Sequence, residues 1–303
     1  MIKIPTYLQK GDTIGIVCPS GYMPKEKIVT CIAVLQQWGY QVKTGKTVGS
    51  QFYYFSGTDA ERLQDLQSML DDKEVKAILS ARGGYGMSRI IDQLDFTKFK
   101  KKPKWLIGFS DITVLHAHLY QHLHIASLHA PMAAAFNDGE YANEFVQSLR
   151  KALKGSVSNY SCDAHTLNRV GKAEGELIGG NLSLVAHVIG SVSSFKTKGK
   201  ILFLEDIGEY IYNIDRMMIQ LKRNGMLQQL SGLVIGGFSE IKDTNTPFGT
   251  DVYAAIYSHI KDYAYPVCFN FPVSHEKNNY ALKVGVKHQL TISQKKTILK
   301  ELR

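Results

Sequence analysis

In the first half of the chain, apolar positions follow two alternating periods, one typical of buried strands and one typical of helices. Short apolar runs at residues 12–18, 75–80 and 105–107 predict strands, because turn residues or charges bound each run. Residues 24–38 carry apolar side chains at helical spacing, and residues 58–61 (TDAE) form a capping box that predicts the start of another helix. Strands separated by helices indicate βαβ units, so we expect an α/β fold with a largely parallel sheet.

The pattern changes in the second half of the chain. Residues 156–170 are polar and aperiodic, which predicts a linker between an N-terminal α/β domain, residues 1–155, and a C-terminal domain, residues 171–303. Strand and helix patterns alternate after the linker, at residues 172–178, 181–189, 200–205, 214–224 and 232–236. The chain then changes to short β-type runs at residues 265–269, 281–286 and 289–293. These runs predict a mixed, partly antiparallel sheet, so we expect the C-terminal domain to be smaller and β-rich.

A serine stands on the predicted turn between a strand and a helix, in the segment WLIGFSDIT at residues 105–113. The strand runs into Gly108, Ser110 follows on the turn, and the next backbone N–H, that of Asp111, would point to where an oxyanion develops. This arrangement predicts a nucleophile elbow, although Ile112 replaces the second glycine of the usual G-x-S-x-G signature. Serine is also a favoured helix cap, so the segment alone leaves a structural role open.

A glycine-rich loop, RGGYG at residues 82–86, follows the predicted strand 75–80 and precedes a helix expected to begin near Met87. Glycines at the carboxyl end of a strand let backbone amides approach a ligand closely. A phosphate cradle is one interpretation, but the loop matches neither of the common nucleotide-binding signatures, so the support for nucleotide binding is weak. Because this loop and the turn at Ser110 both follow the carboxyl ends of strands, the loop is a candidate second oxyanion donor. A tight turn without a catalytic role is the alternative.

A serine nucleophile needs a base within hydrogen-bonding reach. His116 and His118 lie on the helix predicted behind Ser110 and would be poorly aimed at its hydroxyl. His275 is better placed, in the polar loop FPVSHEKNN at residues 271–279, between two predicted strands. A loop histidine that is only solvated is the simpler alternative.

The histidine in turn needs a carboxylate that orients it. The predicted buried strand ILFLED closes with two carboxylates, Glu205 and Asp206. Carboxylates in such a position face a crevice or cap a helix, so Asp206 or Glu209 could instead cap the helix that follows. Ordered along the chain, the candidates for a catalytic triad are Ser110, Glu205 and His275.

Composition and charge narrow the class of protein. Of 303 residues, 44% are hydrophobic and 21% are charged, which is an ordinary globular balance. The net charge of +9 is spread along the chain, so we expect attraction of anionic small substrates and no nucleic-acid partner. No run reaches the roughly 18 apolar residues of a membrane span, and no signal peptide is visible, so we expect a cytoplasmic protein without a membrane partner. Four cysteines at scattered spacing argue against a zinc site or a disulfide framework: Cys18, Cys31, Cys162 and Cys268.

Taken together, these segments resemble the LD-carboxypeptidase family, the cytoplasmic muramoyltetrapeptide carboxypeptidases of bacterial cell-wall recycling. The resemblance spans nearly the full chain, and it depends on the order and spacing of several motifs rather than on any one of them. The motifs are GDTIGIVCPSG (11–21), FSGTDAERLQDLQ (55–67), ARGGYG (81–86), IGFSDIT (107–113), GGNLSL (179–184), LFLEDIGE (202–209), IDRM (214–217) and the FPVSHEKNN loop.

The resemblance implies a catalytic triad of Ser110, Glu205 and His275, with the backbone N–H groups of Asp111 and Gly84 as the oxyanion hole. It also implies a flavodoxin- or Rossmann-like N-terminal domain and a smaller β-rich C-terminal domain, with the site in the cleft between them. The same resemblance implies a homodimer. No metal or cofactor is expected.

The implied activity is that of a serine carboxypeptidase that hydrolyses the bond between an L-configured diamino acid and a terminal D-Ala in murein tetrapeptides. A carboxypeptidase must bind a free carboxylate, and Arg82 and Arg216 are candidates by position, with an ion pair or a braced helix as their structural alternatives. Two positions depart from the family pattern, since Ser274 and Ala130 stand where such proteins often have glycine. The first of these departures bears on how a substrate approaches the site.

Two other functions stay open. An immunity-type peptidase would cleave peptide–nucleotide antibiotics with the same triad, and Tyr85 or the tyrosines of residues 210–212 would stack on the base. The other alternative is a non-catalytic protein of the same fold that binds a small ligand. Alanine at Ser110, Glu205 or His275 would then change ligand binding little, because there would be no activity to lose.

Overall fold

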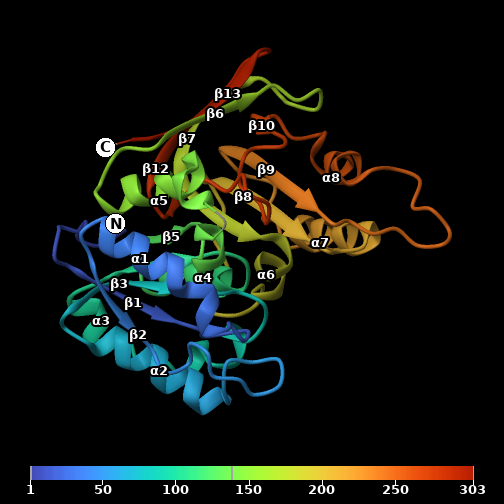
Figure 1. Cartoon of the computed structure of the whole chain (residues 1–303). Helices are drawn as coiled ribbons and strands as arrows, with labels where there is room; N and C mark the ends of the chain where they lie inside the picture. Colours follow the sequence, from blue (N-terminus) through green and yellow to red (C-terminus); the bar gives the residue numbers. More distant parts are fainter. Residues whose placement is uncertain (1, 138, 303) are drawn as a thin grey trace. The chain divides into compact units, whose positions relative to one another are not determined.

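The strands and helices of the first half form an α/β arrangement, as their pattern predicts (Figure 1). The computed structural model describes residues 2–137 and 139–302. The contacts within it divide the chain into two units, Met1–Ser156 with Tyr280–Lys283, and Val157–Asn279 with Val284–Arg303. The described strands form two sheets, one of six strands and one of seven.

The six-stranded sheet belongs to the first unit and has the order β11-β5-β4-β3-β1-β2. Its strands are β1 (Thr13–Val17), β2 (Gln41–Thr44), β3 (Val75–Ser80), β4 (Trp105–Gly108), β5 (Ser127–His129) and β11 (Leu282–Val284). The α-helices of this unit are α1 (Val29–Gln37), α2 (Asp59–Asp71), α3 (Thr97–Lys101), α4 (Thr113–Gln121) and α5 (Glu144–Leu153). Because β1, β3 and β4 are neighbours and run parallel, the loops that leave their carboxyl ends share one edge of the sheet.

The capping box predicted at the start of α2 is confirmed. The Thr58 hydroxyl accepts from the Glu61 N–H at 3.3 Å, and the Glu61 carboxylate accepts from the Thr58 N–H at 2.7 Å. The helix predicted from Met87 is wrong, because two short 3₁₀ turns, Met87–Arg89 and Ile91–Gln93, occupy that segment. Ile90 has φ −120° and ψ −14°, which breaks the helical path between the two turns.

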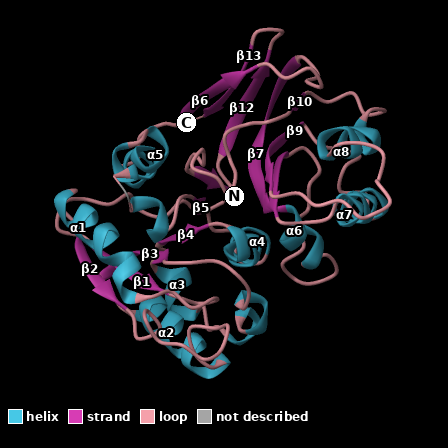
Figure 2. Ribbon diagram, turned by 45° about the vertical axis from the view of Figure 1, so that its right-hand side comes forward, coloured by secondary structure: helices cyan, strands magenta, loops and turns pink. Residues whose placement is uncertain are grey.

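The seven-stranded sheet belongs to the second unit and has the order β10-β9-β8-β7-β12-β13-β6. Its strands are β6 (Asn159–Asp163), β7 (Gly171–Asn181), β8 (Ile201–Ile207), β9 (Gly232–Ser239), β10 (Val267–Cys268), β12 (Lys287–Ile292) and β13 (Lys296–Glu301). β7 to β10 pair in parallel, whereas β7, β12, β13 and β6 pair antiparallel, so the mixed sheet is confirmed. Figure 2 shows the helices α6 (Leu182–His187), α7 (Ile211–Arg223) and α8 (Val252–Ile260) beside the parallel half of this sheet.

The segment expected as a linker, residues 156–170, is partly a strand, because β6 pairs with β13 at the edge of the second sheet. β6 has the sequence NYSCD, and none of its five residues is fully buried. Tyr160 and Cys162 do alternate with polar residues, but the run is short and neither side chain is fully buried, so the strand signal is weak beside the polar residues around it.

The β-type run at residues 281–286, expected in the C-terminal sheet, instead supplies β11 to the six-stranded sheet. Long-range contacts fix it there: the Ala281 N–H donates to the Ser148 hydroxyl at 2.8 Å, and Lys283 lies 4.7 Å from the centre of the Tyr7 ring. Local periodicity predicts a strand but carries no information on which sheet receives it. Among the described residues, no helix has both the length and the apolarity to cross a membrane.

Candidate active site

Ser110 occupies a strained turn between β4 and α4. Its φ of +63° lies in the left-handed region, which residues other than glycine rarely adopt. Gly108, two residues earlier, has φ +158°, and a β-carbon there would lie 2.9 Å from the Ile112 side chain. The turn therefore depends on that glycine, and its backbone has the strained strand-to-helix form of a nucleophile elbow.

The glycine loop after β3 lies directly against this serine. A β-carbon built on Gly83 would lie 2.8 Å from the Ser110 β-carbon and 3.1 Å from its hydroxyl oxygen. Gly84 has φ +97°, a conformation that glycine adopts without strain. The loop that the sequence singled out and the serine are thus neighbours, while the role of the Gly84 N–H as an oxyanion donor stays a prediction.

The buried Asp111 carboxylate ties together the loops at this edge of the sheet. It accepts from the Ser20 hydroxyl at 2.5 Å, in the loop after β1, and from the Met87 N–H at 2.8 Å, in the loop after β3. Sequence reasoning considered only the backbone N–H of Asp111. The side chain adds a positioning role, because it fixes the glycine loop against the turn that carries the serine.

Arg62 has a related role that sequence reasoning missed. Its side chain is fully buried and donates to the carbonyls of Pro19 at 2.5 Å, Gly86 at 3.0 Å and Gly57 at 3.3 Å, and it pairs with Asp59. Its role could have been predicted from the sequence, because Arg62 lies on the apolar face of α2, where a charge is costly unless it is paired and hydrogen-bonded.

His116 supports the turn from behind. Burial lowers the pKa of His116 to about 4, so its imidazole is neutral at pH 7 even though the bond to Gly108 favours the charge. Its Nε2 donates to the Gly108 carbonyl at 2.8 Å, and its Nδ1 accepts from the Ser127 hydroxyl at 2.8 Å. The same Gly108 carbonyl accepts from the Ala130 N–H at 3.2 Å, so Ala130 contributes through its backbone.

The second unit carries a buried carboxylate–histidine pair. The Glu205 carboxylate, at the end of β8, lies 2.6 Å from Nδ1 of His275, and the carboxylate side chain is completely buried. Burial disfavours the charged imidazole, but the hydrogen bond and charge of Glu205, together with Asp206 and Glu240, outweigh it and raise the pKa of His275. The pair predicted from the sequence is therefore formed within this unit, while Ser110 belongs to the first unit.

Two glycines of β9 make room for the loop that carries the histidine. A β-carbon on Gly236 would lie 2.2 Å from the Val273 carbonyl oxygen, and one on Gly237 would lie 2.6 Å from the Ser274 β-carbon. Any larger residue at these positions would push the loop away from β8 and from Glu205. The sequence contained these neighbouring glycines, but no motif linked them to the histidine.

Ser274 stabilises the loop that carries His275 through hydrogen bonds within that loop. Its hydroxyl accepts from the Glu276 N–H at 3.0 Å and lies 3.2 Å from the Asn278 carbonyl oxygen, to which it donates. Ser274 is fully buried. Ser274 therefore stabilises the turn beside His275.

Asp206 has a structural role distinct from that of its neighbour Glu205. It accepts from the Asn181 amide at 2.7 Å and from the Ser183 N–H at 2.9 Å, so it binds the start of α6. Burial raises the pKa of Asp206 to about 6, against the effect of the Ser183 hydrogen bond. The alternative that Asp206 or Glu209 caps the next helix is wrong, because α7 begins after Tyr210 without a side-chain cap.

The residues considered for substrate binding lie in different surroundings. Arg82 donates to the Tyr22 carbonyl at 2.6 Å and is otherwise exposed, and Tyr85 is 47% exposed with its ring 6.0 Å from that of Phe55. Both belong to the glycine loop whose Gly83 lies against Ser110. These two candidates are thus carried close to the serine by their own loop.

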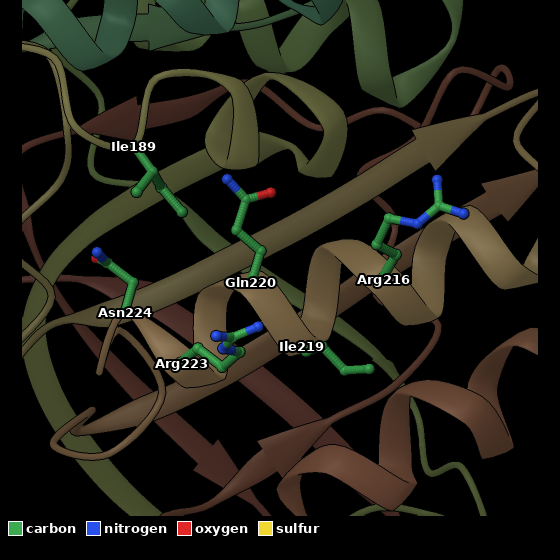
Figure 3. A pocket seen from close by; sticks show the side chains of 6 residues that line it. All are labelled: Ile189, Arg216, Ile219, Gln220, Arg223 and Asn224. Atoms are coloured by element: carbon green, nitrogen blue, oxygen red, sulfur yellow. The ribbon is translucent and has the colours of Figure 1, made fainter.

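Arg216 belongs to α7 in the second unit and lines a pocket of about 430 Å³ there (Figure 3). The other residues that line this pocket are Ile189, Ile219, Gln220, Arg223 and Asn224. The Arg216 guanidinium lies over the Tyr212 ring at 5.3 Å and donates to Asn213 at 3.1 Å. Neither Glu205 nor His275 lines this pocket, so its geometry gives Arg216 no link to the carboxylate–histidine pair.

The exposed aromatic segment 52–55, beside the glycine loop, was not predicted from the sequence as part of the site. Phe52, Tyr53 and Tyr54 are 47%, 82% and 53% exposed, and the Tyr54 hydroxyl would lie 2.9 Å from a β-carbon on Gly84. The run FYYF at these positions is the sequence feature that could have pointed to it. Exposed aromatic side chains next to a candidate site are unusual enough to suggest a ligand.

A strained serine on an α/β turn and a buried glutamate–histidine pair are the parts of a serine hydrolase. The family models of the LD-carboxypeptidase N-terminal and C-terminal domains match residues 14–130 and 174–290. The chain therefore belongs to the LD-carboxypeptidase family. The first match contains Ser110, and the second contains Glu205 and His275.

Individual relatives agree with this membership. The chain is 34% identical to a probable murein peptide carboxypeptidase of Bacillus subtilis, over 97% of this chain and 93% of that protein. It is 26% identical to the microcin C7 self-immunity protein MccF of Escherichia coli, over 97% of this chain and 94% of that protein. A crystal structure of muramoyltetrapeptide carboxypeptidase from Oxalobacter formigenes superimposes with a TM-score of 0.87 at 30% identity, covering 96% of this chain and 99% of that one.

Proposed function

We propose that this protein is a serine carboxypeptidase that removes the terminal D-Ala of murein tetrapeptides by hydrolysing its bond to an L-configured diamino acid. The observation that carries the proposal is the Glu205–His275 pair at 2.6 Å, because a histidine fixed by a buried carboxylate is the base that Ser110 needs. The substrate class comes from relatives named murein peptide and murein tetrapeptide carboxypeptidases, at 34% and 29% identity.

In the proposed mechanism, His275 carries one proton in each of two half-reactions, from Ser110 to the leaving amine and then from water back to Ser110. His275 Nδ1 donates to Glu205, so Nε2 holds the lone pair and takes the proton of the Ser110 hydroxyl. The serine oxygen attacks the carbonyl carbon, and the imidazolium then protonates the leaving D-Ala amine. Water hydrolyses the acyl-enzyme by the same route in reverse. The raised pKa of His275 matches an imidazole whose charged form the carboxylate stabilises.

Two backbone N–H groups, those of Asp111 and Gly84, are the proposed oxyanion hole. The contact of Gly83 with Ser110 supports this assignment, since it brings the glycine loop to the serine. Each donor would stabilise the tetrahedral intermediate, and loss of one such donor costs about 10²- to 10³-fold in turnover.

Arg82 is our choice for binding the terminal carboxylate of the substrate. Its loop contacts the serine turn through Gly83, and only one hydrogen bond of its guanidinium, to Tyr22, is described. Arginine binds carboxylates through two parallel hydrogen bonds, which suits a carboxypeptidase. The exposed rings of Tyr54 and Tyr85 would form a wall of the same site.

We further infer a cytoplasmic homodimer that needs neither metal nor cofactor and binds neither nucleic acid nor membrane. The family resemblance supports the location and the dimer. In the described part of the chain, no cluster of three or more His, Cys, Asp or Glu side chains could hold a metal ion.

An immunity-type peptidase acting on peptide–nucleotide antibiotics is the second candidate. The specific observation in its favour is the pair of half-exposed rings of Tyr210 and Tyr212, stacked at 5.4 Å between centres, just after the strand that carries Glu205. Stacked tyrosines of this kind suit a planar base. The relative named as a microcin C7 self-immunity protein supports the same choice.

The deciding experiment measures D-Ala release by mass spectrometry from a tetrapeptide that ends in diaminopimelate–D-Ala. We expect the wild-type protein to release D-Ala and Ser110→Ala to release none. If neither protein does so, the murein assignment fails and peptidyl-adenylate substrates are tested next. Release by both proteins would reject Ser110 as the nucleophile, and inertness toward every peptide would favour a non-catalytic binding protein.

A further inference from the structure

The two edge strands of the seven-stranded sheet, β10 and β6, are connected by the segment that follows β6. Arg169 forms an antiparallel bridge with Val267 of β10, in which the Arg169 N–H donates to the Val267 carbonyl at 2.9 Å and the Val267 N–H donates back at 3.2 Å. The open side of the sheet thus has a seam, formed by β6, residues 164–169 and β10. The proposed function does not depend on this seam.

A pair of cysteines faces across the seam. Cys162 lies on β6 and Cys268 on β10, where the Cys268 thiol donates to the Phe269 carbonyl at 3.6 Å. The two thiols are close enough for each to alter the pKa of the other, and the Thr297 hydroxyl acts on both. Thr297 is the cross-strand partner of Cys162 on β13, which places its hydroxyl beside the sulfur. Two residues far apart in sequence are therefore brought together although their spacing indicated no pairing.

Asn168 fixes the position of this cluster. Its side-chain oxygen accepts from the Phe269 N–H at 2.8 Å, and its side-chain amide donates to the Thr297 hydroxyl at 3.5 Å. The backbone next to Cys268 and the strand next to Cys162 are therefore both held by one residue. This arrangement keeps the two sulfurs in contact without a covalent bond.

The two thiols differ in the way that disulfide exchange requires. Cys162 is partly exposed, whereas Cys268 is completely buried. The hydrogen bond from Cys268 lowers the pKa of Cys162, burial opposes it, and the Thr297 hydroxyl adds to the lowering. The hydrogen bond with Cys162 and burial raise the pKa of Cys268, so Cys162 is the thiol that attacks first and Cys268 reacts only with the mixed disulfide beside it. Burial also raises the pKa of Cys18 to about 12 and raises that of Cys31, so neither is a good attacking nucleophile.

We propose that Cys162 and Cys268 form a reversible disulfide that closes the seam of the second sheet when the protein meets a low-molecular-weight disulfide. In the first step, the Cys162 thiolate attacks one sulfur of that oxidant and expels the other as a thiolate, which leaves a mixed disulfide on Cys162. The Cys268 thiol then loses its proton and attacks the Cys162 sulfur. The second half of the oxidant leaves as a thiolate, so two protein thiols become one disulfide and the oxidant becomes two thiols.

The bond would close a loop of roughly one hundred residues, which restricts the unfolded chain strongly. We therefore expect the oxidised protein to unfold about 5 °C or more above the reduced protein. Cys268 stands shortly before the loop that carries His275, so the same bond would also anchor the start of that loop.

The test incubates the full-length protein with oxidised glutathione, alkylates the remaining thiols and maps the peptides by mass spectrometry. We expect a peptide joined through Cys162 and Cys268, free Cys18 and Cys31, and loss of the link after reduction with dithiothreitol. Cys31→Ser is the matched control and should keep the cross-link. Cys268→Ser should stop at glutathione bound to Cys162.

The wild-type result decides the proposal even if a cysteine variant fails to fold. Glutathione on Cys162 without a cross-link would overturn it, because the second thiol would then be unable to resolve the first. Four unmodified thiols after prolonged oxidation would overturn it as well. A melting temperature that does not rise on oxidation would reject the stabilising role of the bond.

Discussion

The two halves of the candidate site are built in opposite ways. The serine turn of the first unit is a local structure, since Gly108, Ser110 and Ile112 shape it within a few residues, and its strain is visible in one backbone angle. The Glu205–His275 pair of the second unit is a long-range structure, which requires that β9 carry glycines where the histidine loop crosses it. The form of the serine turn can thus be predicted from a short segment, whereas the contact between the histidine and its carboxylate depends on a whole sheet.

The largest loss of kcat should come from Glu205→Gln, which tests the long-range Glu205–His275 pair of the second unit. A neutral amide cannot stabilise the imidazolium and can favour the wrong tautomer, so we expect kcat to fall by about 10³- to 10⁴-fold. The pH profile gives a second measurement. Because His275 must be neutral to act as a base, activity falls as the pH drops through its raised pKa, and this acid limb should move to lower pH in Glu205→Gln. An unchanged limb would show that another group titrates there.

Gly83→Ala tests the local half and should have the next largest effect. The new β-carbon would lie 2.8 Å from that of Ser110, so either the serine turn or the glycine loop must shift. We expect kcat/KM to fall by about 10²- to 10³-fold, the loss typical of a disrupted oxyanion hole. Gly190→Ala controls for backbone strain alone, because no atom lies within 4 Å of its added carbon while its φ of +89° disfavours any side chain. We expect it to lose some stability and to keep near-normal kinetics. Equal losses in both variants would contradict the contact argument.

Arg62→Met tests whether the loops around the serine turn depend on the hydrogen bonds of the buried Arg62 side chain. The change leaves the carbonyls of Pro19 and Gly86 without their donor, so we expect unfolding to require about 2–4 kcal/mol less free energy. Chemical denaturation measures the loss, with Arg89→Met as a control on an exposed partner of the same Asp59. Similar stability in the two variants would show that burial of Arg62 adds little.

The smallest expected effect is on KM, and it tests which of two arginines, Arg82 or Arg216, binds the substrate carboxylate. Arg82→Ala should raise KM for the tetrapeptide by about tenfold through loss of carboxylate binding, while kcat changes less. Arg216→Ala should leave both constants unchanged, since its guanidinium lines the α7 pocket. Steady-state kinetics distinguish the two, and a raised KM for Arg216→Ala alone would reverse the assignment.

Local features of the fold were predictable from the sequence, and remote pairings were not. The strand at residues 75–80 and the capping box at Thr58 were predicted correctly because both are encoded by adjacent residues. The edge strand β6 and the placement of β11 were not, because their partners lie far away in the sequence.

The same division holds for the candidate site. The turn at Ser110 was predicted from its own segment, and position along the chain made Glu205 and His275 candidates. The family resemblance was needed to favour a catalytic role for them over helix capping or simple solvation. The buried Arg62 and the Asp111 side chain were missed, since a charged residue looks exposed until its partners are known. The Cys162–Cys268 contact was missed for the same reason.

The return of the chain to the first unit at residues 280–283 has a consequence for biosynthesis. Residues 1–156 of the first unit are translated first, yet the edge position taken by β11 stays empty until residues 282–284 have been translated as well. Until then, the exposed edge of β5 is available for wrong pairing with other nascent chains. Truncation shortly before Tyr280 would therefore harm the half of the molecule that was synthesised first.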